Sequence, residues 1–211
     1  MRRSPVCYIC GEETQNPTKD HVIPRCLFPT PPPPNLITLP CHSKCQEKYA
    51  KDEEYFRTHI SVISNLGENA NAREVWKKAL RGLKQRPHQR TDLINRLDDV
   101  DIQTPGGLYI GKAKEVKFSA KRTNRILYKI ARGLFTFHTG KILPRHMISK
   151  FYFKPKDYQP QLLKLAKYSG RFSNIFSYSC VMDEGGSSIW WLVFYQSVHT
   201  IVAFVEKELL K

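Results

Sequence analysis

The pattern of hydrophobic and polar positions predicts helices in the first two thirds of the chain and strands in the last third. Apolar residues recur at helical spacing over residues 43–66, 72–84 and 121–138, and Gly140 is a plausible stop for the last of these helices. Beyond residue 150 the apolar positions alternate between 172 and 182, or form continuous runs over 189–195 and 201–205. We therefore expect antiparallel strands in this part.

The first forty residues predict a β-hairpin. Residues 19–23 and 36–39 have the composition of two short strands, and a proline-rich loop that includes residues 31–34 separates them. Proline lacks the amide hydrogen that a strand ladder needs, so the loop is expected to be extended and unpaired. The fold class is therefore α+β. We expect a hairpin-and-helix module over 1–66, a helical connector over 67–105, and an α+β domain over 106–211.

Positive charge is concentrated in one segment. The chain carries a net charge of +15, and residues 112–170 contain 15 basic and 2 acidic side chains. Segregated positive charge favours a polyanionic partner, nucleic acid before membrane. On the predicted helix over 121–138, four basic residues form one stripe beside the apolar face. We expect this stripe, together with Arg25 near the hairpin, to contact phosphates; it consists of Arg122, Arg125, Lys129 and Arg132.

We expect neither a signal peptide nor a membrane span in this sequence. Cys7 and Pro5 interrupt the place where a signal peptide would need an apolar stretch. The longest apolar run, over residues 189–195, is far shorter than the ~20 residues of a membrane span. We therefore expect a cytoplasmic protein. In a reducing compartment, its six cysteines are better explained as metal ligands or buried thiols than as disulfides.

Two cysteine-containing motifs predict a structural zinc site. Cys7 and Cys10 have the C-x-x-C-G spacing of a zinc knuckle, and a second group lies about thirty residues later. In this second group Cys45 is paired either with His42, which repeats the two-residue gap, or with Cys41. The equal gap favours His42. The remaining thiols, at positions 26 and 180, are expected to be buried.

An acidic residue stands directly before a histidine on the first predicted strand. Asp20 can hold a divalent ion, and the neighbouring His21 can deprotonate water. The alternative is a hairpin in which His21 only packs or caps. These residues by themselves favour neither interpretation.

At this point the sequence resembles the zinc-containing HNH endonucleases, whose ββα-metal fold has a zinc ion that clamps a hairpin to a helix. The resemblance covers about residues 7–57 and rests on the order of four motifs. They are Cys7-x-x-Cys10, Asp20-His21-Val22-Ile23-Pro24, Asn35-Leu36-Ile37-Thr38-Leu39-Pro40 and His42-x-x-Cys45.

The resemblance implies roles for single residues. His21 would be the general base, and Asp20 would bind a catalytic Mg²⁺ or another divalent cation. Asn35 would orient His21 or brace the loop. The family has His or Asn directly after the last zinc cysteine, where this chain has Gln46, a departure from the pattern. Further candidate ligands for the divalent cation are His42, if Cys41 binds the zinc instead, and Glu53 and Glu54 on the predicted helix.

The function implied by the resemblance is metal-dependent hydrolysis of phosphodiester bonds in DNA. A single hairpin site cuts one strand, so double-strand cleavage would need a homodimer or two successive nicks. Gln46 keeps open a second interpretation, a zinc-stabilised nucleic-acid-binding protein without catalysis. An RNA-directed nuclease that uses the same hairpin is the third.

Overall fold

The N-terminal part of the fold is a hairpin followed directly by a long helix. The computed structural model describes residues 5–64, 69–153 and 165–206. Strands β1 (Thr18–His21) and β2 (Thr38–Cys41) pair antiparallel, with Thr18 opposite Cys41 and His21 opposite Thr38. A 3-10 turn, η1 (Arg25–Leu27), lies in the connection, and helix α1 (Ser43–Ile63) begins two residues after β2. The predicted hairpin and first helix are confirmed.

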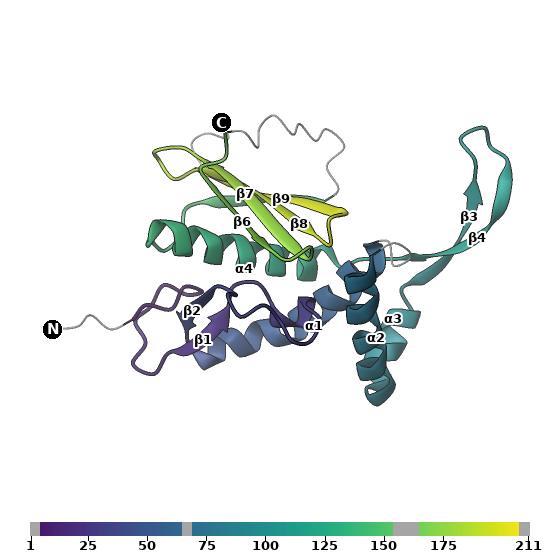
Figure 1. The fold of residues 1–211 in the computed structure, drawn as a ribbon, viewed down its shortest axis with the longest axis horizontal. Coiled ribbons are helices and arrows are strands. Elements are labelled where there is room, and N and C mark those ends of the chain that lie inside the picture. Colours follow the sequence, from purple (N-terminus) through teal and green to yellow (C-terminus); the bar gives the residue numbers. More distant parts are fainter. Residues whose placement is uncertain (1–4, 65–68, 154–164, 207–211) are drawn as a thin grey trace.

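Two shorter helices and a ribbon follow α1. Helix α2 (Ala70–Gln85) packs against α1 and leads into α3 (Pro87–Ile94). Strands β3 (Leu97–Gln103) and β4 (Tyr109–Val116) then form a two-stranded antiparallel ribbon. Figure 1 shows this ribbon projecting away from the rest of the molecule.

The predicted connector over 67–105 is helical in α2 and α3, and strand β3 of the ribbon occupies its last part. The breaker at residues 104–107 is the turn between β3 and β4, where the Gly107 amide donates to the Thr104 carbonyl at 2.9 Å. The expected boundary near residue 105 therefore lies inside one structural unit. Both faces of the ribbon are largely exposed, so its strands need no alternation of apolar and polar residues, and the pattern gave no signal.

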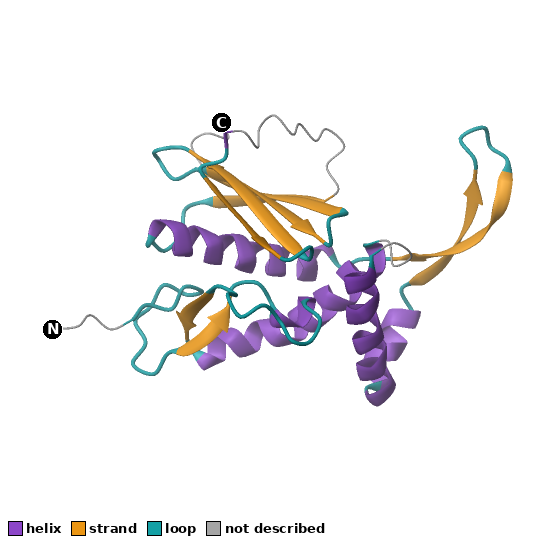
Figure 2. Cartoon of the chain, in the orientation of Figure 1, coloured by secondary structure: helices purple, strands orange, loops and turns teal. Residues whose placement is uncertain are grey.

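The C-terminal part is a five-stranded antiparallel sheet, as the alternation predicted. Its strands are β5 (Ile148–Phe153), β6 (Tyr168–Phe172), β7 (Phe176–Met182), β8 (Ser188–Phe194) and β9 (Val198–Val205), in the spatial order β5-β9-β8-β7-β6. Figure 2 shows the sheet covering one side of helix α4 (Ala120–Thr139). This helix ends at Gly140, whose φ of 67° is the left-handed conformation that glycine adopts readily.

Helix α4 is the middle layer of the molecule. The sheet lies on one side of it, and the hairpin and α1 lie on the other (Figure 1). One hydrophobic core runs from Val22 in the N-terminal part through Ile130 of α4 to Phe204 of the sheet. The regions predicted as separate units over 1–66 and 106–211 therefore share a core.

A close approach at Gly133 joins α4 to the N-terminal part. A Cβ atom at Gly133 would lie 2.6 Å from Cγ1 of Val22 and 3.1 Å from Cε2 of Tyr8. Real Cβ contacts are longer than this, so only glycine allows α4 to come so near.

The basic stripe of α4 is paired with groups of α1 and the N-terminal part, while the Arg122 and Arg125 side chains stay 31% and 44% exposed, so phosphate contact by these two remains a prediction. Arg122 Nε lies 2.6 Å from Oδ1 of Asp52, and Arg125 Nη1 lies 2.5 Å from Oδ2 of the same carboxylate. Arg132 is buried, and its Nε donates to the Tyr8 carbonyl at 2.8 Å. The prediction missed this because periodicity shows which face is apolar and does not show what covers the polar face.

Lys129 is the fourth member of the stripe and is buried completely. It is 1% exposed, and its ammonium lies 2.9 Å from Oδ2 of Asp20, binds the Glu53 carboxylate, and donates to the His21 carbonyl at 3.2 Å. Burial disfavours the charged ammonium, but the Glu53 and Asp20 carboxylates outweigh it and raise the pKa of Lys129. The lysine therefore stays charged and links the hairpin, α1 and α4.

Replacement of this lysine tests the link. Lys129→Met leaves the buried Asp20 and the half-buried Glu53 without their cation, so we expect a loss of about 3–5 kcal/mol in the free energy of unfolding. Lys121→Met, at an exposed position of the same helix, is the matched control and should change stability by less than about 0.5 kcal/mol. Urea denaturation followed by circular dichroism measures both. Equal stabilities for the two variants would contradict the role of the buried ammonium.

Candidate metal centre and hairpin site

Four side chains from two separate segments converge where the hairpin meets α1. One pair comes from the loop before β1, and the other comes from the start of α1. Their ligand atoms all lie within 4.8 Å of one another, close enough for one ion to contact all four. Three thiols and one imidazole form a ligand set typical of structural zinc. The group, which can hold a metal ion such as zinc, consists of Cys7, Cys10, His42 and Cys45.

Local backbone geometry brings each pair together. In the first segment the Gly11 amide donates to the Cys7 carbonyl at 2.8 Å, and Gly11 adopts a φ of 81° that permits this tight turn. In the second segment His42 is the extended N-cap residue of α1, and Cys45 lies in the first turn. The Cys45 amide donates to the His42 carbonyl at 3.0 Å, which holds the two side chains on the same turn.

The imidazole of His42 is oriented as a metal ligand. Its Nδ1 lies 3.3 Å from Sγ of Cys10, and its Nε2 lies 3.2 Å from the carbonyl oxygen of Glu13. A metal-binding histidine usually donates its other ring N–H to a carbonyl or a carboxylate. In His42, Nδ1 faces the cysteine group and Nε2 faces the Glu13 carbonyl, as this arrangement requires.

Cys41, the alternative ligand, lies beside the group and is not one of its members. Its Sγ donates to the His42 carbonyl at 3.2 Å and lies 3.8 Å from Sγ of Cys7. Burial and then the charge of Cys7 raise the pKa of both Cys41 and Cys45, so the positions of the sulfur atoms, and not their pKa, separate the two thiols. At Cys7 burial opposes the charge, but backbone donors including the Cys10 and His42 amides lower the pKa to about 6. The equal spacing that favoured His42 over Cys41 agrees with this geometry.

The Asp20 carboxylate is occupied by protein groups. It is 3% exposed, and its Oδ2 accepts a hydrogen bond from the Tyr8 hydroxyl at 2.5 Å and binds the Lys129 ammonium. Burial and then the charge of Asp20 raise the pKa of Tyr8, so the hydroxyl keeps its proton and donates. Sequence patterns do not single out Tyr8, because it lies between the two knuckle cysteines and its partner Asp20 is 12 residues along the chain.

His21 lies on the opposite face of β1 from Asp20, because neighbouring residues of a strand alternate. It is partly exposed. Burial and then the positive charge of Arg25 lower the pKa of His21 below its ordinary value. A neutral imidazole that can accept a proton is the result.

Most of the other predicted site residues have partners of their own. Asn35 is exposed in the loop before β2, and the Gln46 Oε1 accepts a hydrogen bond from the Thr18 hydroxyl at 3.2 Å. Glu53 binds Lys129, and Glu54 forms an ion pair with Arg86. These contacts assign the two glutamates to packing between elements.

The residues proposed for a catalytic divalent ion do not fit that ion in this arrangement. Mg²⁺ needs carboxylate or amide oxygens that can turn toward it. Asp20 is buried and balanced by an ammonium, and Gln46 is bonded to the strand. Within residues 5–64, 69–153 and 165–206, the cysteine–histidine group is the one cluster of potential metal-binding side chains.

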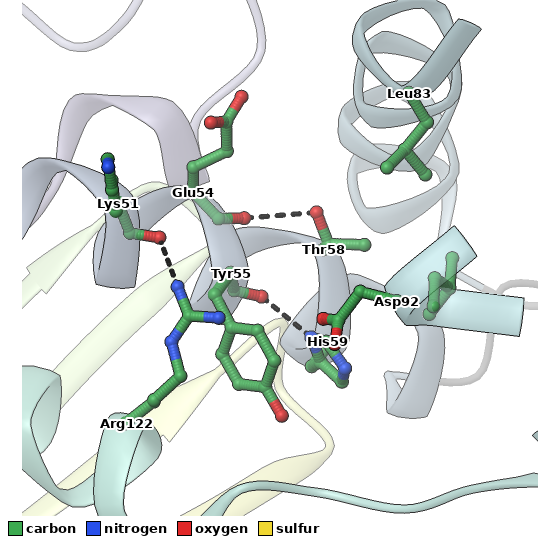
Figure 3. Close-up of a pocket in the computed structure, with 9 residues that line it drawn as sticks. Lys51, Glu54, Tyr55, Thr58, His59, Leu83, Asp92 and Arg122 are labelled. Carbon is green, nitrogen blue, oxygen red and sulfur yellow. Dashed lines mark hydrogen bonds between the residues drawn. The ribbon is translucent and has the colours of Figure 1, made fainter. Parts of the chain in front are cut away.

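A small pocket lies beside the middle of α1, and no hairpin residue lines it. Figure 3 shows Tyr55, His59 and Asp92 facing it, with the Arg122 guanidinium donating to the Lys51 carbonyl at its edge. Its volume is about 50 Å³. A water molecule takes ~30 Å³ in the liquid, so the pocket suits a water and is too small for a nucleobase.

Two cysteine substitutions test the ligand assignment. Cys45→Ser removes a proposed ligand, so we expect the purified protein to lose its zinc and to unfold at a lower temperature. Cys41→Ser changes the neighbouring thiol that lies outside the group and should keep one zinc per chain. Metal content by mass spectrometry and thermal unfolding measure both. Zinc loss in Cys41→Ser with zinc retained in Cys45→Ser would reverse the assignment.

No family model, curated protein or solved structure matches this chain. None of the helices in the described parts of the chain is long and apolar enough to cross a membrane.

Proposed function

We propose that this chain is an HNH-type endonuclease in which His21 is the general base. The observation that carries the proposal is the layout of the N-terminal part. A two-stranded hairpin is followed directly by α1, and the Cys7–Cys10–His42–Cys45 group joins the loop before the hairpin to the start of that helix. This layout corresponds to the order of motifs that resembles the HNH endonucleases.

The surroundings of His21 suit proton abstraction from water. A general base must be neutral at the working pH, and both burial and Arg25 favour the neutral imidazole. Arg25 itself is exposed in η1, four residues along the chain. An exposed guanidinium beside the base can bind a phosphate oxygen and stabilise the negative charge that develops during cleavage.

The predicted Mg²⁺ dependence is not part of this mechanism. Asp20 and Gln46 would both have to leave their present partners to bind a divalent ion, so we derive no step through one. Cleavage is therefore best measured with Mg²⁺, with Mn²⁺ and in EDTA. Plasmid, single-stranded DNA and RNA substrates then separate a DNA nuclease from an RNA-directed one.

A second function is favoured by one observation, the buried Asp20–Lys129 pair. In a zinc-stabilised nucleic-acid-binding protein without catalysis, the hairpin would need no free carboxylate. Such a protein would bind the same substrates and leave them intact under every metal condition.

The base assignment predicts the effect of removing the imidazole. His21→Ala should abolish cleavage, a loss of at least ~10²-fold, because the proton acceptor is absent. His146→Ala, which removes an exposed histidine outside the hairpin, is the control and should cleave like the unmodified chain. Both variants should retain zinc and substrate binding. Unchanged cleavage in His21→Ala would exclude His21 as the base.

The pH dependence follows from the same group. Because the pKa of His21 lies below its ordinary 6.5, the imidazole is neutral at pH 7–8, and the rate should be flat there. The rate should fall only when the pH drops through that lowered pKa and the base becomes protonated. Arg25→Gln removes a positive neighbour, so it should move the acidic limb to higher pH. A limb that stays in place would show that another group titrates.

A further inference from the structure

We propose that the outward face of helix α2 is the surface that holds the nucleic-acid backbone. This inference rests on the proposed class of substrate, nucleic acid, and does not require that the chain cleave it. On α4, Lys129 and Arg132 are buried, and Arg122 and Arg125 both pair with Asp52, so the stripe offers less uncompensated charge than its sequence suggests. The strongest exposed arrangement of basic side chains on a single helix is found on α2.

Charge on α2 and α3 is one-sided. Residues 70–96 carry eight basic and two acidic side chains, although this stretch lies outside the basic block that composition singled out. The acidic residues of β3, directly downstream, offset this positive charge when the net charge of the first half of the chain is summed. The structure separates the two, because β3 belongs to the projecting ribbon.

The basic residues of α2 lie opposite its buried face. Ala72, Val75 and Ala79 are buried, which places this side of the helix in the interior. At 100° per residue, the solvent-facing basic residues fall within an arc of about 80° on the other side. They are Arg73, Lys77, Arg81 and Lys84, and all four are exposed.

The stripe continues onto α3. Lys84 and Arg90 both line a groove of about 520 Å³ between α2, α3 and β4, so cations of both helices border the same groove. Over residues 73–84 the stripe alone is ~16 Å long at 1.5 Å per residue. A duplex presents one negative charge per ~1.7 Å of axis, so a segment of this length offers a phosphate to each cation.

The position of α2 connects this surface with the hairpin. The Lys78 ammonium donates to the Thr30 hydroxyl at 3.3 Å, and Thr30 lies in the loop that joins β1 to β2. A backbone held along α2 would therefore pass beside the connection that follows His21 and Arg25. Figure 1 shows α2 extending away from the sheet, with α3 beside it.

Nucleic acid fits this surface better than a membrane. A helix that binds a lipid surface presents an apolar face to the acyl chains. On the apolar side of α2, Val75 is 1% exposed, and Leu80 is 40% exposed at the groove between α2 and α3. The outward face carries the four cations, which suits backbone recognition without sequence reading.

The test compares two charge-matched variants in the full-length chain, each also carrying His21→Ala so that binding is measured without cleavage. Lys77→Gln, Arg81→Gln and Lys84→Gln together remove three charges from α2. Three exposed lysines of the downstream block are replaced in the control, which consists of Lys121→Gln, Lys141→Gln and Lys150→Gln. Fluorescence anisotropy with a duplex DNA, a single-stranded DNA and an RNA, at several salt concentrations, gives the affinities. Vesicles containing anionic lipid provide the membrane arm.

The α2 variant should weaken nucleic-acid binding by roughly 8-fold per residue at 0.1 M salt and reduce the salt slope by about 2.7, while the control changes little. The relative losses on the three nucleic acids identify the preferred one. Equal losses in both variants, or a loss in the control alone, would overturn the assignment to α2. Vesicle binding that depends on α2 while nucleic-acid binding does not would overturn the choice of partner. If the unmodified chain cleaves none of the substrates, the nuclease proposal fails, whereas a positive result for binding to α2 still stands.

Discussion

The buried ammonium of Lys129 determines how the N-terminal part and the rest of the chain are joined. Moving an ion into the protein interior costs several kcal/mol even after relaxation, so the position is stable only where other groups replace the lost water. Here the replacements come from two elements, Asp20 and the His21 carbonyl from β1 and Glu53 from α1. These contacts require that α4 lie against both, and Gly133 removes the side chain that would hold it away.

This arrangement changes the meaning of the positive charge. The segment with 15 basic and 2 acidic residues suggests a surface for a polyanion. In the structure its central helix is covered by the sheet on one side and by α1 on the other, and Asp52 alone binds two of its arginines. Much of the stripe therefore compensates internal carboxylates. On α2, by contrast, the basic side chains of the stripe face solvent, because they lie opposite the buried face of the helix.

Local patterns were sufficient for much of the fold. Apolar periodicity located α1, α2 and α4 to within a few residues, and alternation located the sheet. The metal-binding group followed from spacing, because two C-x-x-C-like turns need few residues and little context. The ribbon of β3 and β4 was not predicted because neither of its faces is buried. The partners of Lys129 were not predicted because Asp20 and Glu53 are remote from it in sequence. Periodicity does not show which polar face of one element packs against which face of another.

The two faces of the hairpin consequently have different tasks. On β1 the side chains of Thr18 and Asp20 point inward, where one bonds to Gln46 and the other to Lys129 and Tyr8. His21 points the other way and keeps an exposed edge. Neighbouring side chains on a regular strand point to opposite faces, so Asp20 and His21 could share one surface site only if a bulge lay between them. No bulge is present, because β1 pairs with β2 in unbroken register. Asp20 therefore contributes to the stability of the joint between hairpin and α4, and any chemistry of this hairpin depends on groups of the outer face.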